Sequence, residues 1–520
     1  MTVVGLWLLA TLTGLLTRPL IPADELRYAA VAWEMWARGD FLVPYLNGEP
    51  YSHKPPLFFW LIHVGWWLFG VSEWVVRAVA PVLALLILLV SALLARQLWP
   101  QEAVIARQVP AVLFSSVFLV AFFTWVQIDL LLVLCVLLGM LGIVFAARQH
   151  GSGWLLTGVA IGLGLLAKGP VILLHLLPVA LLAPLWLPAA VRHGWSWYAA
   201  IVASVLMGAA MALAWALPAA QAGGEAYREA IFWGQTAARV VDSFAHAHPV
   251  WWYLPWLLLL FAPWIWLPWL WRAARQSWQQ RDSGMRFCLS WLVSVFFLLS
   301  LVSGKQLKYL LPLSPVFALL VAHVISRMPQ RPLTNRPWLL AGLLAGLGVI
   351  GMVAPFVLDN APWLNDVHPL WGGLLVLLAA LLLYLPPARP DQYPLRMLAL
   401  SVCVVCIGEL GVLRIGAPAY DLKQASHLLA LAQAEGRPVA VLDRYHGQFG
   451  FYGRLTEPLI QLHPGQAHAW ARQHPRGYLV ITDRKSAAAP VSARFAQPYQ
   501  GGYLAILDAA AVAENGPPLP

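Results

Sequence analysis

Charged residues are scarce in this chain. They make up 11% of its 520 residues, whereas hydrophobic residues make up 60%. An ordinary soluble domain carries about 25% charged residues, so this composition excludes a water-facing surface over the whole length, and most of the chain must face lipid. Cysteine is scarce too. Cys135, Cys288, Cys403 and Cys406 all lie in apolar stretches. No disulfide framework is implied, and helix packing explains even the Cys403–Cys406 pair.

Apolar runs recur through the first 415 residues, and each is long enough, or nearly so, to cross a hydrocarbon core of about 30 Å as a helix. The net charge of +10 does not indicate nucleic-acid binding, because the Lys and Arg residues form short clusters between the apolar runs, as membrane orientation requires. The sequence therefore predicts a polytopic all-α membrane protein with about thirteen spans. They cover roughly 3–18, 73–98, 103–124, 128–147, 153–170, 171–188, 196–217, 250–271, 286–303, 309–326, 338–358, 369–386 and 395–415.

The loops between these spans predict an orientation. Alternate loops contain most of the arginines, such as Arg148, Arg192 and Arg327, and by the positive-inside rule they are cytoplasmic. The N-terminus then lies in the cytoplasm. The membrane domain covers 1–415 and carries two long outer loops, 19–72 and 218–249.

The remainder, 416–520, is polar from Tyr420 onward and is predicted to lie outside the membrane. The stretch "DLKQASHLLALAQAEG" has helical spacing and ends at Gly436. "RPVAVLD" and "RGYLVITD" are typical of short buried strands. We expect a small extracytoplasmic α/β domain.

The first outer loop is rich in ionisable residues. Its sequence is "PADELRYAAVAWEMWARGDFLVPYLNGEPYSHKPPLFFW". Residues 28–38 have amphipathic helical spacing, with Tyr28, Val31, Met35 and Trp36 on one apolar face, which predicts a short helix in the interface plane. Such a helix can hold a charged loop against the membrane surface, where lipid-borne substrates lie.

Further ionisable residues lie at the predicted outer ends of spans. Asp129 begins the fourth span, Lys168 ends the fifth, and Lys305 and Lys308 lie between the ninth and tenth. Lysines that snorkel to headgroups and an aspartate that caps a helix are the alternative explanations. Acids and lysines together in one outer layer are hard to obtain by chance, and they indicate an anionic ligand on that face.

These residues also carry a family resemblance. The first loop resembles that of the ArnT/protein-mannosyltransferase-like GT-C glycosyltransferases: an acidic pair followed by Arg-Tyr, a Gly-Asp-x-x-x-Pro-x-x-Asn-Gly run, and Tyr-x-x-Lys-Pro-Pro. The segments "QIDLLL", "LLAKGP", 232–255 and "SGKQLKYLLPL" are also similar, in the same order. The resemblance implies a GT-C fold and an inverting transfer of a sugar from a polyprenyl (undecaprenyl) phosphate carrier on the periplasmic side of the bacterial inner membrane.

The resemblance assigns roles to individual residues. Asp24 matches the first-loop acid and is our choice for the catalytic base, with its neighbour Glu25 as the alternative and Asp129 as a second acid. The leaving group is a lipid phosphate, so charge stabilisation matters more than protonation. The residues expected to bind the donor phosphate are Lys54, Lys168, Arg27, Tyr51, Tyr309, Lys308 and Lys305.

A divalent metal is a further implication, because some relatives bind one at the position before the Tyr-x-x-Lys lysine. That position is often Glu in the ArnT branch and is His53 here. With His246 and His248 it forms a candidate zinc-type site. Structural or surface histidines are the alternative.

The ArnT branch transfers 4-amino-4-deoxy-L-arabinose to lipid A, and lipid A modification is the predicted function. A periplasmic glycan or a protein such as a pilin remains open as the acceptor, as for protein O-glycosyltransferases and arabinosyl- or mannosyltransferases. A flippase or transporter for lipid-linked sugars is the alternative from another class. It predicts deep intramembrane charges and internal repeats, and neither is apparent.

Overall fold

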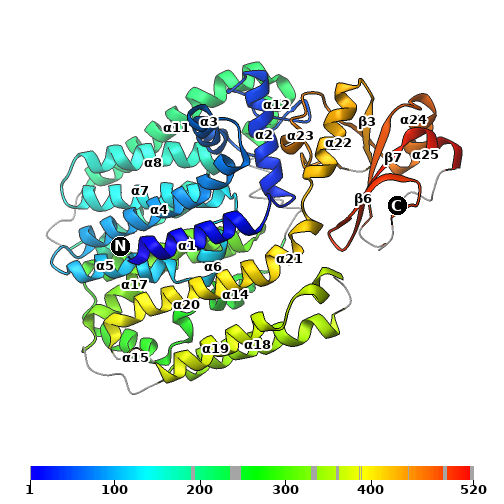
Figure 1. Ribbon diagram of the computed structural model, residues 1–520. Coiled ribbons are helices and arrows are strands. Elements are labelled where there is room, and N and C mark those ends of the chain that lie inside the picture. The colour runs from blue at the N-terminus through cyan, green and yellow to red at the C-terminus, as the bar shows by residue number, and fades with distance from the viewer. Residues whose placement is uncertain are drawn as a thin grey trace.

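A long bundle of helices carries a small sheet domain at one end (Figure 1). This computed structural model describes residues 2–188, 194–234, 247–329, 336–358, 362–385, 387, 389–442, 444–483, 486 and 489–515. The α1 helix (Thr2–Thr17) runs along the bundle, and α2 (Asp24–Arg38) turns across its end, beside the sheet domain. The chain therefore brings its first outer loop and its C-terminal part together.

The helices that follow α2 alternate between long apolar segments and short connecting ones. In the first half they are α3 (Leu57–Phe69), α4 (Glu73–Leu98), α5 (Ala103–Phe114), α6 (Val117–Phe122), α7 (Ile128–Ala147), α8 (Ser152–Lys168), α9 (Val171–Leu181), α10 (Ala183–Trp186), α11 (Trp195–Gly223), α12 (Glu225–Glu229) and η2 (Ala230–Gly234). Then come η3 (Val250–Trp252), α14 (Tyr253–Leu260), η4 (Trp264–Trp266), α15 (Pro268–Ser277), η5 (Trp278–Gln280), α16 (Ser283–Leu301), η6 (Leu307–Leu313), α17 (Ser314–Arg327), α18 (Trp338–Val357), η7 (Pro362–Asp366), α19 (Leu370–Tyr384), η8 (Pro390–Gln392), α20 (Tyr393–Gly408), η9 (Glu409–Leu413), α21 (Arg414–Gly416) and η10 (Ala417–Ala419). In the described ranges, seven helical segments are long and apolar enough to cross a membrane, and seven shorter apolar ones accompany them.

Each of the thirteen predicted spans contains helix, but three are broken, and the one predicted at 171–188 divides into α9 and α10 at Leu182. The span predicted at 103–124 divides into α5 and α6, because Ser116 leaves the helical conformation and its hydroxyl accepts a hydrogen bond from the Leu119 N–H, which starts a new helix. The span predicted at 250–271 divides into α14 and α15 around Pro263 and Pro268, since proline cannot continue the backbone hydrogen bonding of a helix.

The first outer loop contains more helix than the sequence indicated. The amphipathic helix expected at 28–38 is present as α2, and Tyr28, Val31 and Met35 are buried on its inner face. The sequence-based prediction assigns residues 57–69 to the loop and so misses α3. It also misses α12 and η2 in the second outer loop. The α3 helix and the α12–η2 segment are each shorter than a membrane crossing, so span length did not reveal them.

The interior of the bundle is organised around α7. In the most apolar 18-residue stretch of α7, 78% of the residues are buried, whereas 17% are buried in the corresponding stretch of α11. The α7 helix is therefore covered by other helices, whereas α11 presents most of its surface to lipid. The functional consequence is that Asp129, in the first turn of α7, lies inside the protein.

The C-terminal part is an α/β domain, as predicted. Its five strands lie in the order β4-β3-β5-β7-β6, with β3 parallel to β4 and β5, and β7 antiparallel to β5 and β6. Alternate β3 residues face opposite ways: Ala440 and Leu442 pack beneath α24 and α25, and Val439 and Val441 face the main core. The elements are α22 (Lys423–Ala434), β3 (Val439–Leu442), α23 (Gly450–Gly453), β4 (Ile460–Leu462), η11 (Pro464–Gln466), α24 (Ala467–Gln473), β5 (Tyr478–Asp483), β6 (Ala493–Tyr499), β7 (Gly502–Asp508) and α25 (Ala509–Asn515).

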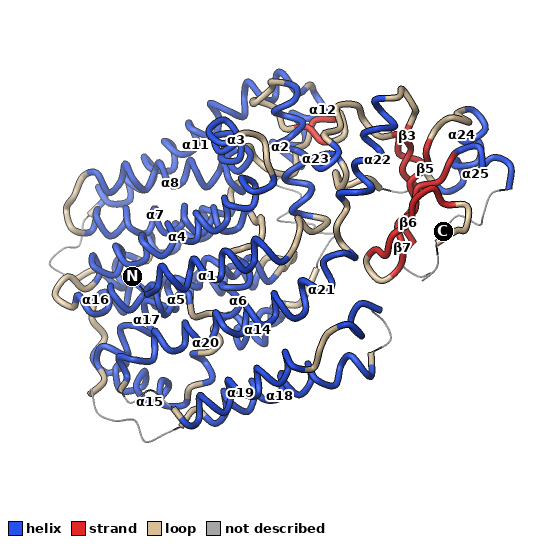
Figure 2. The backbone as a smooth tube through the Cα atoms, in the orientation of Figure 1, coloured by secondary structure: helices blue, strands red, loops and turns tan. Residues whose placement is uncertain are grey.

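This domain is docked on the first outer loop through the segment that contains α23 (Figure 2). The Trp33 indole N–H donates to the Leu455 carbonyl over 2.9 Å. The Phe451 ring stacks on Trp66, and the Tyr452 hydroxyl accepts a hydrogen bond from the Leu20 N–H. Buried aromatic stacking and hydrogen bonds to the backbone make this a packed interface rather than a loose tether.

Candidate active site

The α2 helix supplies the acid that the sequence placed at the centre of the site. Asp24 and Glu25 occupy the first turn of α2, where the positive end of the helix dipole favours carboxylates. The two side chains point in different directions, because adjacent helical residues are about 100° apart. Their environments differ accordingly.

Asp24 lies among cations. Its carboxylate is 3.1 Å from the Lys308 ammonium and 3.6 Å from the Arg27 guanidinium, and a third of its side chain is exposed. Burial favours the neutral acid, but Lys308, Arg27 and Lys54 outweigh it and hold the pKa of Asp24 below its ordinary value. Asp24 is thus an accessible, charged carboxylate at neutral pH.

A second acid–lysine pair lies deeper. Asp129 in the first turn of α7 contacts the ammonium of Lys168, the last residue of α8. Both side chains are largely buried. Each charge lies at the helix end that its sign favours, because the N-terminus of α7 meets the C-terminus of the neighbouring α8.

The segment η6 joins the two pairs. Lys308 reaches Asp24 and interacts electrostatically with Asp129 as well, and the ring of the next residue, Tyr309, lies 4.3 Å from the Lys168 ammonium. Segments distant in the sequence, α2, the α7–α8 pair and η6, therefore converge on one cluster of alternating charges.

Tyr28 on α2 borders this cluster, and so does the end of a hairpin formed by β1 (Tyr45–Leu46) and β2 (Glu49–Pro50). Burial raises the pKa of Tyr28, and the charges of Asp24 and Asp129 act in the same direction. Tyr51 follows the hairpin and is buried, with its ring 5.3 Å from that of His53. Lys54 comes next and acts on Asp24. The Tyr-x-x-Lys run thus reaches the same cluster as Asp24.

Glu25 lies outside the cluster. One carboxylate oxygen accepts hydrogen bonds from the Arg18 guanidinium and from the Ile21 N–H, each over 2.7 Å, and the other accepts one from the Val126 N–H, also over 2.7 Å. Arg18 and Glu25 are almost fully buried. This occupied carboxylate is the weaker candidate for the base, and it leaves Asp24 as the acid that faces the cations.

Arg18 is a residue whose importance the sequence reasoning missed. It donates to the Thr124 carbonyl over 2.8 Å as well as to Glu25, and so ties the start of α2 to the loop that precedes Asp129. The available signal was a charge at the end of the first apolar span, seven residues before Glu25.

Lys305 is also turned away from the cluster. Its ammonium donates to the His248 carbonyl over 3.0 Å and to the Val302 carbonyl over 2.5 Å, and the residue is almost fully buried. These bonds join the loop before η6 to the segment before η3. Of the lysines expected to bind the donor phosphate, Lys305 has the weakest structural support.

The expected metal site involves three histidines. His246 falls outside the described residues. The ring of His248 stacks on Trp252 at 4.4 Å, and His53 contacts Tyr51. Within the described ranges, no three His, Cys, Asp or Glu side chains lie close enough to hold a metal ion, so metal binding stays a prediction.

Comparisons with known proteins agree with this arrangement. Residues 53–216 match the family model described as dolichyl-phosphate-mannose-protein mannosyltransferase. Undecaprenyl phosphate-alpha-4-amino-4-deoxy-L-arabinose arabinosyl transferases from Edwardsiella ictaluri and Erwinia tasmaniensis are similar. The first is 32% identical over 72% of this chain and 67% of its own, and the second is 31% identical over 68% and 64%. The chain thus aligns with about two thirds of the length of these relatives.

The fold matches a solved structure over nearly its whole length. ArnT from Cupriavidus metallidurans, crystallised with undecaprenyl phosphate, superposes with a TM-score of 0.78 at 20% identity and covers 98% of both chains. Its apo form superposes with a TM-score of 0.75. The fold, the cluster of acids and lysines at one end of the bundle, and the sequence identity lead to the same conclusion: the chain is a multi-pass integral membrane protein that belongs to the ArnT family of GT-C glycosyltransferases.

Proposed function

We propose that this protein transfers 4-amino-4-deoxy-L-arabinose from undecaprenyl phosphate to lipid A on the extracytoplasmic face of the inner membrane. The observation that supports it most is the ion pair between Asp24 and Lys308 beside the Lys168–Asp129 pair. A carboxylate can accept a proton from an acceptor, and the adjacent ammonium groups can hold a lipid phosphate. The relatives from Edwardsiella and Erwinia are named for this donor and this sugar.

The chemistry needs one bond made and one broken. A nucleophilic oxygen of the acceptor attacks the anomeric carbon of the sugar, while the bond from that carbon to the phosphate oxygen breaks and its electron pair stays on the phosphate. Asp24 takes the acceptor's proton, or orients an acceptor that is already ionised. The configuration at the anomeric carbon inverts, because attack and departure take place on opposite sides.

The leaving phosphate gains negative charge as the bond breaks. Lys54, Lys168 and Lys308 supply positive charge where it develops, and Arg27 can bind two phosphate oxygens at once. Asp24 and Asp129 keep two of these lysines in place through their ion pairs, so little reorganisation is needed when the phosphate binds.

The orientation proposed from the arginines also fits the bundle. Arg327 ends α17 and is paired with Glu102 and Asp282, at the opposite end of α17 from the segment that carries Lys308. We assign the Arg327 end to the cytoplasm and the Asp24 end, with the C-terminal domain, to the periplasm. Labelling of single cysteines with a membrane-impermeant reagent tests this: positions 420–515 should react from outside and 272–282 only after permeabilisation.

The function is tested with the purified protein in lipid nanodiscs, the sugar on undecaprenyl phosphate, and lipid A. Wild type should release undecaprenyl phosphate and yield lipid A with the added mass of one sugar. Asp24→Asn and Lys54→Met should lose transfer while unfolding within a few degrees of the wild-type temperature. Glu435→Gln, which alters an exposed ion pair in the C-terminal domain, is the matched control.

Two results would remove the proposal. Normal turnover in both Asp24→Asn and Lys54→Met would show that the reaction takes place elsewhere. The second is a mass spectrum of cells that express the protein in which envelope proteins or glycans gain the sugar and lipid A does not. It would show that lipid A is not the acceptor.

A further inference from the structure

The β1–β2 hairpin connects three parts of the molecule that the site requires. Its strands β1 (Tyr45–Leu46) and β2 (Glu49–Pro50) are joined by Asn47 and Gly48, which both have positive φ, at 56° and 82°. This is the backbone of a two-residue hairpin turn, for which Asn-Gly is a favoured sequence. The turn alone would explain why Asn47 is present, but its side chain makes contacts that a turn does not need.

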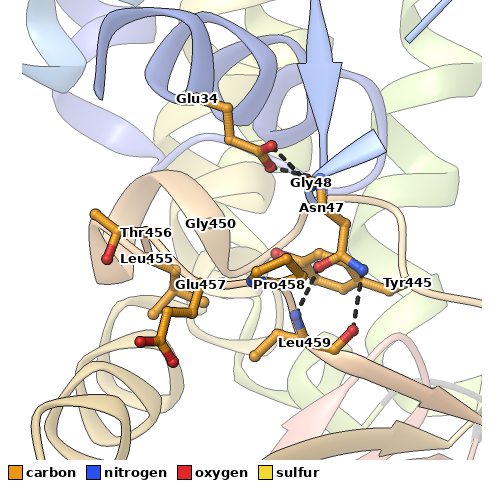
Figure 3. Close-up of a pocket in the computed structure, with 10 residues that line it drawn as sticks. All are labelled: Glu34, Asn47, Gly48, Tyr445, Gly450, Leu455, Thr456, Glu457, Pro458 and Leu459. Atoms are coloured by element: carbon orange, nitrogen blue, oxygen red, sulfur yellow. Dashed lines mark hydrogen bonds between the residues drawn. The ribbon is translucent and has the colours of Figure 1, made fainter. Parts of the chain in front are cut away.

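The Asn47 side chain bridges to the C-terminal domain (Figure 3). Its amide group donates to the Leu459 carbonyl over 3.0 Å, and its carbonyl accepts from the Leu459 N–H over 2.8 Å. The two bonds form a reciprocal pair like one rung of a sheet. Leu459 immediately precedes β4, so the hairpin is fastened to the edge of the C-terminal sheet.

The backbone of the same turn is fastened to α2. The Glu34 carboxylate accepts hydrogen bonds from the Asn47 N–H over 2.5 Å and from the Gly48 N–H over 3.0 Å. Glu34 and Asp24 belong to one helix. Burial raises the pKa of Glu34, which the two N–H groups and Arg38 partly offset, and the Glu34 side chain is half-buried at this junction.

The junction is closely packed. A β-carbon added at Gly48 would lie 2.6 Å from the Pro458 ring, closer than atoms can approach. The cavity left between the hairpin and the segment 455–459 has about 10 Å³, about the space of one water molecule. A shift of the C-terminal domain therefore has to move the turn with it.

The turn leads directly to the phosphate-binding residues. After β2 the Tyr51 N–H donates to the Pro44 carbonyl over 2.7 Å, which extends the hairpin, and Lys54 follows. Pro55 and Pro56 stand after Lys54 and restrict the backbone on that side. The backbone at Lys54 is thus constrained by the hairpin on one side and by the two prolines on the other.

We propose that Asn47 is a positioning residue, through which the C-terminal domain sets the placement of Tyr51 and Lys54 against Asp24. The inference rests on the proposed function of the cluster. It gives the C-terminal domain a part in donor binding although none of its residues needs to touch the donor.

The test uses a substitution that the turn itself tolerates. Asn47→Gly keeps the positive-φ turn and removes only the bridge to Leu459. Asn47→Asp keeps the acceptor for the Leu459 N–H and loses the donor. Gln433→Ala is the matched control, because its side-chain amide donates to the Glu457 carbonyl in the same segment, away from the hairpin.

Four quantities are measured on full-length protein in nanodiscs: kcat, the affinity for undecaprenyl phosphate, the KM for the acceptor, and the rate of hydrogen exchange. Asn47→Gly should lower kcat roughly 10- to 100-fold, as expected when a group is misplaced by about 1 Å. It should weaken the binding of undecaprenyl phosphate roughly tenfold and leave the KM for the acceptor unchanged. Asn47→Asp should fall between Asn47→Gly and wild type, and Gln433→Ala should match wild type. Hydrogen exchange should become faster in peptides that cover residues 45–54.

The outcomes separate this inference from the proposed function. Wild-type kcat and carrier affinity in Asn47→Gly, with faster exchange in the hairpin, would overturn the positioning role. Equal losses in Asn47→Gly and Gln433→Ala would overturn it too, since they would reflect the fold of the segment. If wild type binds undecaprenyl phosphate but transfers no arabinose, the proposed sugar is wrong, and the affinity and exchange measurements still decide the role of Asn47.

Discussion

Removal of the charge should affect different properties of the protein at the adjacent acids Asp24 and Glu25. Glu25→Gln replaces a carboxylate that accepts three hydrogen bonds of 2.7 Å, and it leaves the Arg18 guanidinium, whose side chain is 0% exposed, without a counter-charge. Asp24→Asn removes a carboxylate whose side chain is 34% exposed. Glu25→Gln should therefore lower stability and Asp24→Asn should lower activity.

The magnitudes follow from burial. Removal of one partner of a buried ion pair costs about 3–5 kcal/mol, because the other charge stays buried and uncompensated. An ion pair that water reaches contributes about 1 kcal/mol or less. Glu25→Gln should thus lose about 3–5 kcal/mol of unfolding free energy, and Asp24→Asn at most about 1 kcal/mol.

Unfolding is followed in nanodiscs by tryptophan fluorescence, since the Trp125 ring lies 5.0 Å from the Arg18 guanidinium carbon, and transfer is measured on the fraction that remains folded. The double variant Arg18→Met with Glu25→Gln removes both charges. It should be more stable than the sum of the two single losses implies, because the uncompensated charge is gone. A Glu25→Gln protein with wild-type stability and no activity, alongside an active Asp24→Asn protein, would show that the roles are reversed and that our choice of base is wrong.

Two further predictions concern the lysines of the cluster. Burial favours the neutral form of Asp24, and Lys308 is the largest opposing influence, so Lys308→Met should raise the pKa of Asp24. Because activity is lost as pH falls through that pKa, the acidic limb of the kcat/KM profile should move up by roughly 1 pH unit. Lys308→Arg should restore the wild-type profile, and an acidic limb that Lys308→Met leaves unmoved would exclude Asp24 as the titrating group. Lys168→Met leaves Asp129 buried without its partner and should cost about 3–5 kcal/mol of unfolding free energy. Thermal unfolding should show part of that loss recovered in Lys168→Met with Asp129→Asn, and equal stability of the single and double variants would contradict the buried pair.

The sequence predicted much of this arrangement, because membrane burial constrains it strongly. The apolar runs located the helices, and ionisable residues at the ends of runs pointed to Asp129, Lys168 and Lys308, which the structure brings into one cluster with Asp24. A charge in such a place is costly, so its position in the sequence carries information.

The sequence contained no comparable information about the direction in which side chains point. The sequence could not choose between Asp24 and Glu25, because their difference depends on the rotation of α2 and on Arg18 and Val126, which contact only Glu25. The sequence groups Lys305 with Lys308 as a residue that binds the donor phosphate, and it could not reveal that the Lys305 ammonium donates to two backbone carbonyls. The contacts of Asn47 with Leu459 were equally invisible, because a turn explains an Asn-Gly pair by itself.

The bridge from Asn47 to Leu459 also affects how the enzyme is made. Its two ends are separated by 412 positions along the chain. At roughly 5–20 residues per second of synthesis, the hairpin waits roughly 20–80 s for its partner. During that interval Tyr51 and Lys54 lack one of their supports. Nascent or prematurely terminated chains would thus insert most of their helices and still bind the lipid carrier weakly, so turnover reaches its full rate only after the C-terminal domain has folded onto the hairpin.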